Sequence, residues 1–112
     1  MTKGFGGNIG QLMAQAQKMQ SRLAALKTEL KSRTVEASAG GGMVTAVARG
    51  DLSIASIKID PKVVDPNDVE MLEDLVFGAV DGALKAARDM AAKEMESVGR
   101  GLGLPPGFKL PF

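Results

Sequence analysis

The chain has 112 residues, of which 45% are hydrophobic, and its 14 basic and 13 acidic side chains leave a net charge of +1. It contains no Cys and no His, so it lacks disulfides, the best transition-metal ligands and the usual general base near neutral pH. This composition favours a single small domain without metal, cofactor or catalysis. No apolar run approaches the roughly 20 residues of a membrane span, and the N-terminus lacks a signal peptide's apolar segment. We therefore expect a cytoplasmic protein that binds no membrane.

Charge is distributed unevenly along the chain. Residues 1–33 hold six basic side chains and one acidic side chain, a net charge of +5, whereas residues 60–81 hold one basic and seven acidic side chains, a net charge of −6. A near-neutral total therefore conceals a basic segment and an acidic segment, which can have different partners.

A long first helix is predicted from about residue 8 to 33. Its apolar residues follow alternating steps of three and four over three heptads, at Ile9, Leu12, Ala16, Met19, Leu23, Leu26 and Leu30. The Gly-rich first seven residues are expected to be loose, with Asn8 as the N-cap. This apolar seam could pack within its own subunit or against a second copy.

Three short segments then predict an antiparallel meander. They span 34–39, 43–49 and 52–59, separated by Gly40-Gly41-Gly42 and by Gly50-Asp51. In the last segment Leu52 and Ile54 share one parity while Ile57 and Ile59 share the other. A β-bulge near Ala55-Ser56 would place them on one face.

A second helix is predicted from about residue 66 to 98, with Asp65 as N-cap and Pro66 at its first position. Gly78 and Gly82, one turn apart, permit close approach of a neighbouring element. Residues 99–112 are rich in Gly and Pro and form a C-terminal tail. The prediction is thus an α+β fold of order α-β-β-β-α, with a single domain at 1–98 and a tail at 99–112.

Several stretches in this order resemble the YbaB/EbfC family of nucleoid-associated proteins. They are Gln15-Ala-Gln-Lys-Met19, Gly41-Gly-Met-Val44, Ile57-Lys-Ile-Asp-Pro61, Asp65-Pro-Asn-Asp-Val-Glu-Met-Leu-Glu-Asp-Leu-Val76 and Leu104-Pro-Pro-Gly-Phe-Lys-Leu-Pro-Phe112. The resemblance implies a homodimer with projecting helices that binds double-stranded DNA in the bacterial nucleoid. It also implies low sequence preference and effects on chromosome organisation or gene expression.

Basic side chains on the two helices are the candidate DNA contacts, because Lys and Arg meet phosphates and release counterions. On the first helix, Lys18, Arg22 and Arg33 fall on one flank of the seam and Lys27 and Lys31 on the other. Lys85, Arg88 and Lys93 form a weaker set on the second helix, since Lys85 has Asp81 and Asp89 as i,i+4 neighbours. The residues expected at the dimer contact are Leu23, Leu26, Leu30, Ile54 and Ile57. An ordinary solvated helix face remains the simpler interpretation of any one charge run.

Other sites are disfavoured. Glu70, Glu73 and Asp74 share a helix face but lie near a helix start, where acids are stabilising without a metal. The Gly40–42 stretch lacks the Gly-Lys-Ser/Thr of a phosphate-binding loop, so no small-molecule substrate is expected. An alternative function is a protein-interaction adaptor in replication, repair or transcription that uses the heptad helix and the tail.

Overall fold

The computed structural model describes the backbone of residues 2–101 and the side chains of residues 9–100. Its elements are α1 (Thr2–Ser32), β1 (Thr34–Ala39), β2 (Val44–Arg49), β3 (Ile54–Ile59), a short 3₁₀ turn η1 (Pro61–Val63) and α2 (Val69–Gly101). The three strands form one sheet in the order β1-β2-β3, so the predicted α-β-β-β-α fold is confirmed. Residues 102–112, most of the predicted tail, lie outside the described residues.

The start of α1 differs from the prediction. Helical backbone begins at Thr2 and runs through Asn8, so the first residues are not a loop and Asn8 is not an N-cap. Glycine costs helix propensity, but adding residues to an existing helix avoids the cost of nucleation. The long helix formed by residues 9–32 thus continues through the Gly-rich segment.

The sheet has the predicted bulge. Val47 pairs with Ser56 whereas the next residue, Ala48, pairs with Ile54, which leaves Ala55 as the extra residue of β3. Because the bulge resets the alternation of side chains, Ile54, Ile57 and Ile59 lie opposite Ala48, Ala46 and Val44 and share one face. The β1–β2 turn is also confirmed as a glycine turn, since Gly40, Gly41 and Gly42 all have positive φ.

The start of α2 lies three residues later than predicted. Pro66 and Asn67 form a turn in which the Asp68 N–H donates to the Asp65 carbonyl oxygen at 2.9 Å. Asp68 is the actual cap, because its Oδ1 accepts from the Met71 N–H at 3.2 Å. Asp65 and Pro66 therefore form a turn before the helix, the arrangement in which Asp leads and Pro follows.

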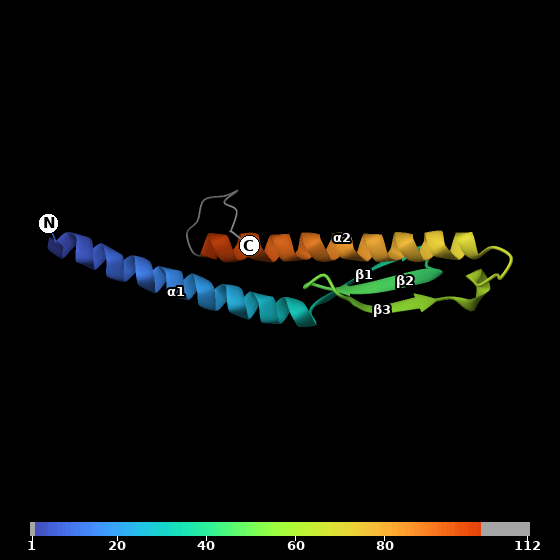
Figure 1. Cartoon of the computed structure of the whole chain (residues 1–112), viewed down its shortest axis with the longest axis horizontal. Coiled ribbons are helices and arrows are strands. Elements are labelled where there is room, and N and C mark those ends of the chain that lie inside the picture. The colour runs from blue at the N-terminus through green and yellow to red at the C-terminus, as the bar shows by residue number, and fades with distance from the viewer. Residues whose placement is uncertain (1, 102–112) are drawn as a thin grey trace.

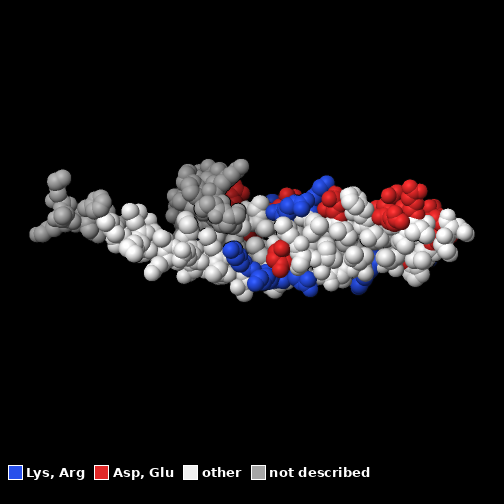
Figure 2. Space-filling model, in the orientation of Figure 1, with Lys and Arg blue, Asp and Glu red and all other residues white. Residues whose placement is uncertain are grey.

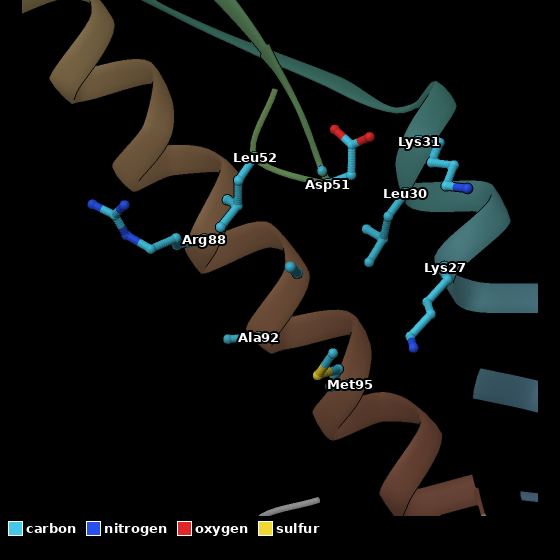
Figure 3. Close-up of a pocket in the computed structure, with 10 residues that line it drawn as sticks. Lys27, Leu30, Lys31, Asp51, Leu52, Arg88, Ala92 and Met95 are labelled. Carbon is cyan, nitrogen blue, oxygen red and sulfur yellow. The ribbon is translucent and has the colours of Figure 1, made fainter. Parts of the chain in front are cut away.

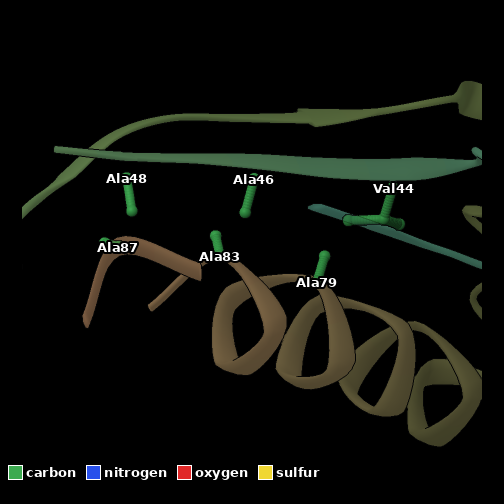
Figure 4. Close-up of a cluster of buried hydrophobic side chains, with 6 residues drawn as sticks. All are labelled: Val44, Ala46, Ala48, Ala79, Ala83 and Ala87. Atoms are coloured by element: carbon green, nitrogen blue, oxygen red, sulfur yellow. The ribbon is translucent and has the colours of Figure 1, made fainter. Parts of the chain in front are cut away.

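The core lies between α2 and one face of the sheet. Its fully buried residues are nearly all alanine, and Figure 4 shows those of α2 facing those of β2: Val44, Ala46, Ala48, Ala79, Ala83 and Ala87. Small side chains allow α2 to lie close to the strands, and a Cβ built at Gly82 would lie 3.1 Å from the Cβ of Ala37. The close approach predicted from Gly78 and Gly82 is therefore made to β1, and α2 covers β1 and β2 more than β3.

The described chain is an elongated rod of 79 × 22 × 17 Å. Figure 1 shows α2 lying along the sheet and continuing past one end of it, and α1 extends from that same end beyond the C-terminal end of α2. The C-terminal end of α1 is anchored at Leu26 and Leu30, both buried, and at buried Gly50, whose N–H donates to the Arg33 carbonyl oxygen at 3.0 Å. The earlier seam residues Ile9 and Leu12 are exposed, so the seam packs within the subunit only at its C-terminal end.

Candidate nucleic-acid interface

A surface groove of about 530 Å³ lies where α1, α2 and the β2–β3 hairpin meet. We call it the groove, and it is lined by Lys27, Leu30, Lys31, Gly50, Asp51, Leu52, Arg88, Ala91, Ala92 and Met95. Figure 3 shows Leu30 and Lys27 extending from α1 toward the space between the helices, Leu52 lying against α2, and Arg88 extending from α2 away from that space. The groove thus has an apolar floor with cations on both rims.

The charge of the groove is almost entirely positive. Its one acid, Asp51, accepts from the hydroxyl of Ser53 at 2.6 Å and from the Ser53 N–H at 3.1 Å. These hydrogen bonds, with smaller contributions from Arg49 and Lys31, lower the pKa of Asp51. Among the described residues, Lys31 and Arg88 form no ion pair, so both cations face solvent without a bound carboxylate.

The other side of the α1–α2 contact carries a similar number of cations in different surroundings. We call it the paired flank, and it comprises Arg22, Glu29, Arg33, Asp89, Lys93 and Glu94, which line two further hollows. The Arg33 guanidinium donates to Glu94 Oε1 at 2.6 Å and lies 3.7 Å from Glu29. The hydrogen bond and charge of Glu94 raise the pKa of Arg33, and this cation is already neutralised within the chain.

The predicted DNA contacts are therefore divided among several places. Lys27, Lys31 and Arg88 line the groove. Arg22, Arg33 and Lys93 lie on the paired flank. Lys18 lies exposed on the projecting part of α1, and Lys85 pairs with Asp81 at 3.0 Å, as its spacing predicted. The separation of Arg22 and Arg33 from Lys27 and Lys31 is confirmed, but the pairing of Arg33 across 61 residues left no signal in the sequence.

Acidic residues gather at the opposite end of the molecule. Figure 2 shows them clustered over the start of α2, with the visible basic residues lying mainly toward the middle of the rod. No set of three acids in the described part of the chain is arranged to hold a metal ion. No helix among residues 2–101 is long and apolar enough to cross a bilayer.

Sequence reasoning did not identify Leu52 as part of the site. Leu52 has φ of +69° at the tip of the β2–β3 hairpin, a left-handed conformation that costs a non-glycine residue about 1–2 kcal/mol. It is nevertheless a large apolar residue and is 46% exposed. The available signal was its position directly after Gly50-Asp51, where Gly or Asn is the usual residue.

The five residues predicted at a dimer contact also differ in their surroundings. Leu26 and Leu30 are buried within their own chain, Leu23 and Ile54 are half-buried, and Ile57 is 43% exposed. Ile57 and Ile59 share the sheet face on which α2 lies, yet α2 leaves much of both uncovered. The described chain therefore presents an apolar strip along β3.

Comparisons with known proteins agree with this architecture. A family model described as the YbaB/EbfC DNA-binding family matches residues 5–102. The chain is 55% identical over 105 residues to a nucleoid-associated protein of Acetivibrio thermocellus, covering 94% of this chain and 93% of the relative. A nucleoid-associated protein of Clostridium kluyveri is 50% identical over 105 residues, covering 94% of this chain and 92% of the relative.

A solved structure shows the same fold. The crystal structure of an uncharacterized protein from Helicobacter pylori superposes with a TM-score of 0.68 at 21% identity, covering 77% of this chain and 90% of that one. The fold and the family match together define a DNA-binding protein of a non-enzymatic class. The chain belongs to the YbaB/EbfC family of nucleoid-associated DNA-binding proteins, as its motifs predicted.

Proposed function

We propose that this protein binds double-stranded DNA through phosphate contacts made by the groove cations Lys27, Lys31 and Arg88, with low sequence specificity. The observation that carries the proposal is that these three cations, from two helices, line one groove, whose one acid is hydrogen-bonded to Ser53. Phosphate contacts fix the position of a protein on DNA without reading its sequence.

Cations outside the groove extend this surface. Lys18 lies exposed along α1 and would meet phosphates farther along a duplex. Arg22, also exposed on α1, lies on the paired flank beside Glu29 and Glu94 and would contribute less. Lys85, Lys93 and Arg33 have carboxylates beside them, so we assign them smaller contributions. The apolar floor offers no aromatic side chain for stacking on bases, which favours duplex over single-stranded DNA.

The functional unit in this proposal is a homodimer in the cytoplasm, associated with the nucleoid. A second copy would cover the apolar strip of Ile57 and Ile59, which lies at a sheet edge, and exposed strips of this kind mark contact surfaces. Leu26 and Leu30 contribute by anchoring α1 within each chain, and Leu23 lies beside them. Such a dimer would affect chromosome organisation or gene expression by occupying DNA.

A salt series tests the DNA proposal. Fluorescence anisotropy would measure affinity for two duplexes of unrelated sequence at increasing salt. Each phosphate contact contributes roughly −0.9 to the slope of log affinity against log salt, so three contacts predict about −3 per chain and nearly twice that for a dimer. Similar affinity on both duplexes with such a slope supports the proposal, and a salt-insensitive affinity contradicts it.

Light scattering tests the homodimer separately. The wild-type protein is expected to have twice the chain mass, and Ile57→Asp is expected to have the mass of one chain because a charge would be buried at the contact. Lys58→Asp, on the adjacent and opposite-facing position of β3, is the matched control and should remain dimeric. A single-chain mass for the wild type would contradict the dimer.

A further inference from the structure

Phe77 is an exposed aromatic residue surrounded by acids. It lies on the outer side of α2 and is 72% exposed, whereas α2 packs on the sheet through Ala79, Ala83 and Ala87. Glu73, Asp74 and Asp81 lie three or four residues from Phe77, and such residues are its neighbours on a helix surface. We call Phe77 with Glu70, Glu73 and Asp74 the acidic knob, since Asp81 is paired with Lys85 at 3.0 Å.

The acidic knob and the groove are complementary in polarity and in charge. The groove offers an apolar floor of Leu30, Leu52 and Met95 with cations on its rims, and the knob offers an apolar centre with acids around it. A phosphate backbone could neutralise the rims but would leave the apolar floor in contact with water. An aromatic side chain with flanking carboxylates covers the floor and neutralises the rims together.

We propose that the groove of one copy of this chain binds the acidic knob of another. The groove lies between the two helices beside the β2–β3 hairpin. The knob lies in the first turns of α2, whose next residue after Phe77, Gly78, packs beside Ala39 at the end of β1 away from that hairpin. The contact therefore joins two different surfaces, and it links molecules head to tail unless two copies pair reciprocally, with each groove binding the other's knob. Two knobs facing each other would bring like charges together, which disfavours the symmetric alternative.

This contact would oppose DNA binding, and that part of the inference rests on the proposed function. Lys27, Lys31 and Arg88 cannot meet phosphates and the carboxylates of a knob at the same time. DNA should therefore dissolve the head-to-tail assemblies, and high protein concentration should weaken DNA binding at low salt. The self-association itself requires no DNA and can be measured alone.

Disulfide trapping tests the contact directly, since the chain has no cysteine of its own. Cysteines beside the contact leave Phe77 and Leu52 in place: Ala92→Cys lies in the groove, and Asp81→Cys lies one turn from Phe77. The two proteins, purified separately and mixed at low salt under mild oxidant, are expected to form a mixed disulfide faster than either forms a disulfide with itself. Met13→Cys, an exposed position on α1, is the control and should pair with neither. Predominant pairing of Asp81→Cys with itself, or no pairing above the control, would overturn the proposal.

Sedimentation velocity without DNA provides a second test that needs no cross-link. The wild type should form species larger than its basic unit as concentration rises, and Phe77→Ala should abolish them, whereas Met13→Ala should not. The Glu70→Lys/Glu73→Lys and Lys31→Glu/Arg88→Glu variants should each fail to assemble alone but assemble when mixed. Equal assembly of the wild type and Phe77→Ala would overturn the proposal, even if duplex binding proceeds as proposed.

Discussion

The two sides of the α1–α2 contact have three cations each, but one carboxylate lines the groove and three lie on the paired flank. In the groove, Lys27, Lys31 and Arg88 surround an apolar floor, and the one carboxylate is held by Ser53. On the paired flank, Arg33 is bound to Glu94 at 2.6 Å, and Lys93 lies near Asp89 and Glu94. The difference teaches that the number of basic residues on a helix does not measure its attraction for DNA, because nearby carboxylates decide how much charge reaches solvent.

Charge reversal on each side should give the largest difference in duplex affinity between the groove and the paired flank. Lys31→Glu/Arg88→Glu and Arg22→Glu/Lys93→Glu each change the charge of the chain by −4, but only the first pair removes groove cations. We expect the groove variant to lose duplex affinity by roughly 100-fold and its salt slope to fall by about 2. The paired-flank variant should lose several-fold less, as measured by anisotropy. Equal losses would mean that only total charge matters.

Changing the contact between Gly50 and Leu30, which anchors α1, should lower the stability of the fold. A Cβ at Gly50 would lie 2.8 Å from the carbonyl oxygen and a methyl carbon of Leu30, so Gly50→Ala forces overpacking and should lower the free energy of unfolding by about 1–3 kcal/mol. Denaturant unfolding measures the change. Gly10→Ala, with nothing near the added Cβ, is the control and should raise stability slightly. An unchanged free energy of unfolding for Gly50→Ala would contradict the close contact between Gly50 and Leu30.

Removing an acid should make the paired flank resemble the groove. Glu94→Gln deletes the charge that neutralises Arg33, so duplex affinity should rise by roughly threefold at low salt while stability falls by less than about 1 kcal/mol. Glu36→Gln on β1 removes an equal charge that is not an ion-pair partner of Arg33 and is the matched control for anisotropy. If Glu94→Gln and Glu36→Gln gain duplex affinity equally, the local pairing of Arg33 does not limit DNA binding.

The smallest effect is expected at Asp51. The Ser53 hydrogen bonds lower the pKa of Asp51 from its ordinary 3.8. The ionised carboxylate of Asp51 therefore stabilises the folded state at pH values above its ordinary pKa of 3.8. This contribution is lost as the pH falls through the lowered pKa of the folded state. Asp51→Asn should show a shallower loss of stability in acid unfolding below about pH 4, together with a slight gain in duplex affinity at neutral pH. An acid-unfolding profile identical to wild type would contradict the hydrogen-bonded state of Asp51.

The sequence predicted the element order, the glycine turn and the bulge at Ala55, because each has a local signature. It misplaced both helix starts, since Gly-rich Thr2–Asn8 joins an already formed helix and Asp65-Pro66 makes a turn before Asp68. Periodicity also divided the α1 cations correctly between two flanks. It could not show which flank meets Arg88, or that Arg33 binds Glu94, because these contacts depend on where α2 crosses α1.

Lysine footprinting tests the central claim most directly. The protein would be acetylated briefly with and without saturating duplex DNA, and the modification of each lysine would be measured by mass spectrometry. Lys27, Lys31, Lys85 and Lys93 are all exposed in the single chain, so each can report contact with DNA. Our account predicts that DNA protects Lys27 and Lys31 strongly and leaves Lys85 and Lys93 reactive. Protection of Lys85 and Lys93 with unchanged reactivity of Lys27 and Lys31 would contradict it.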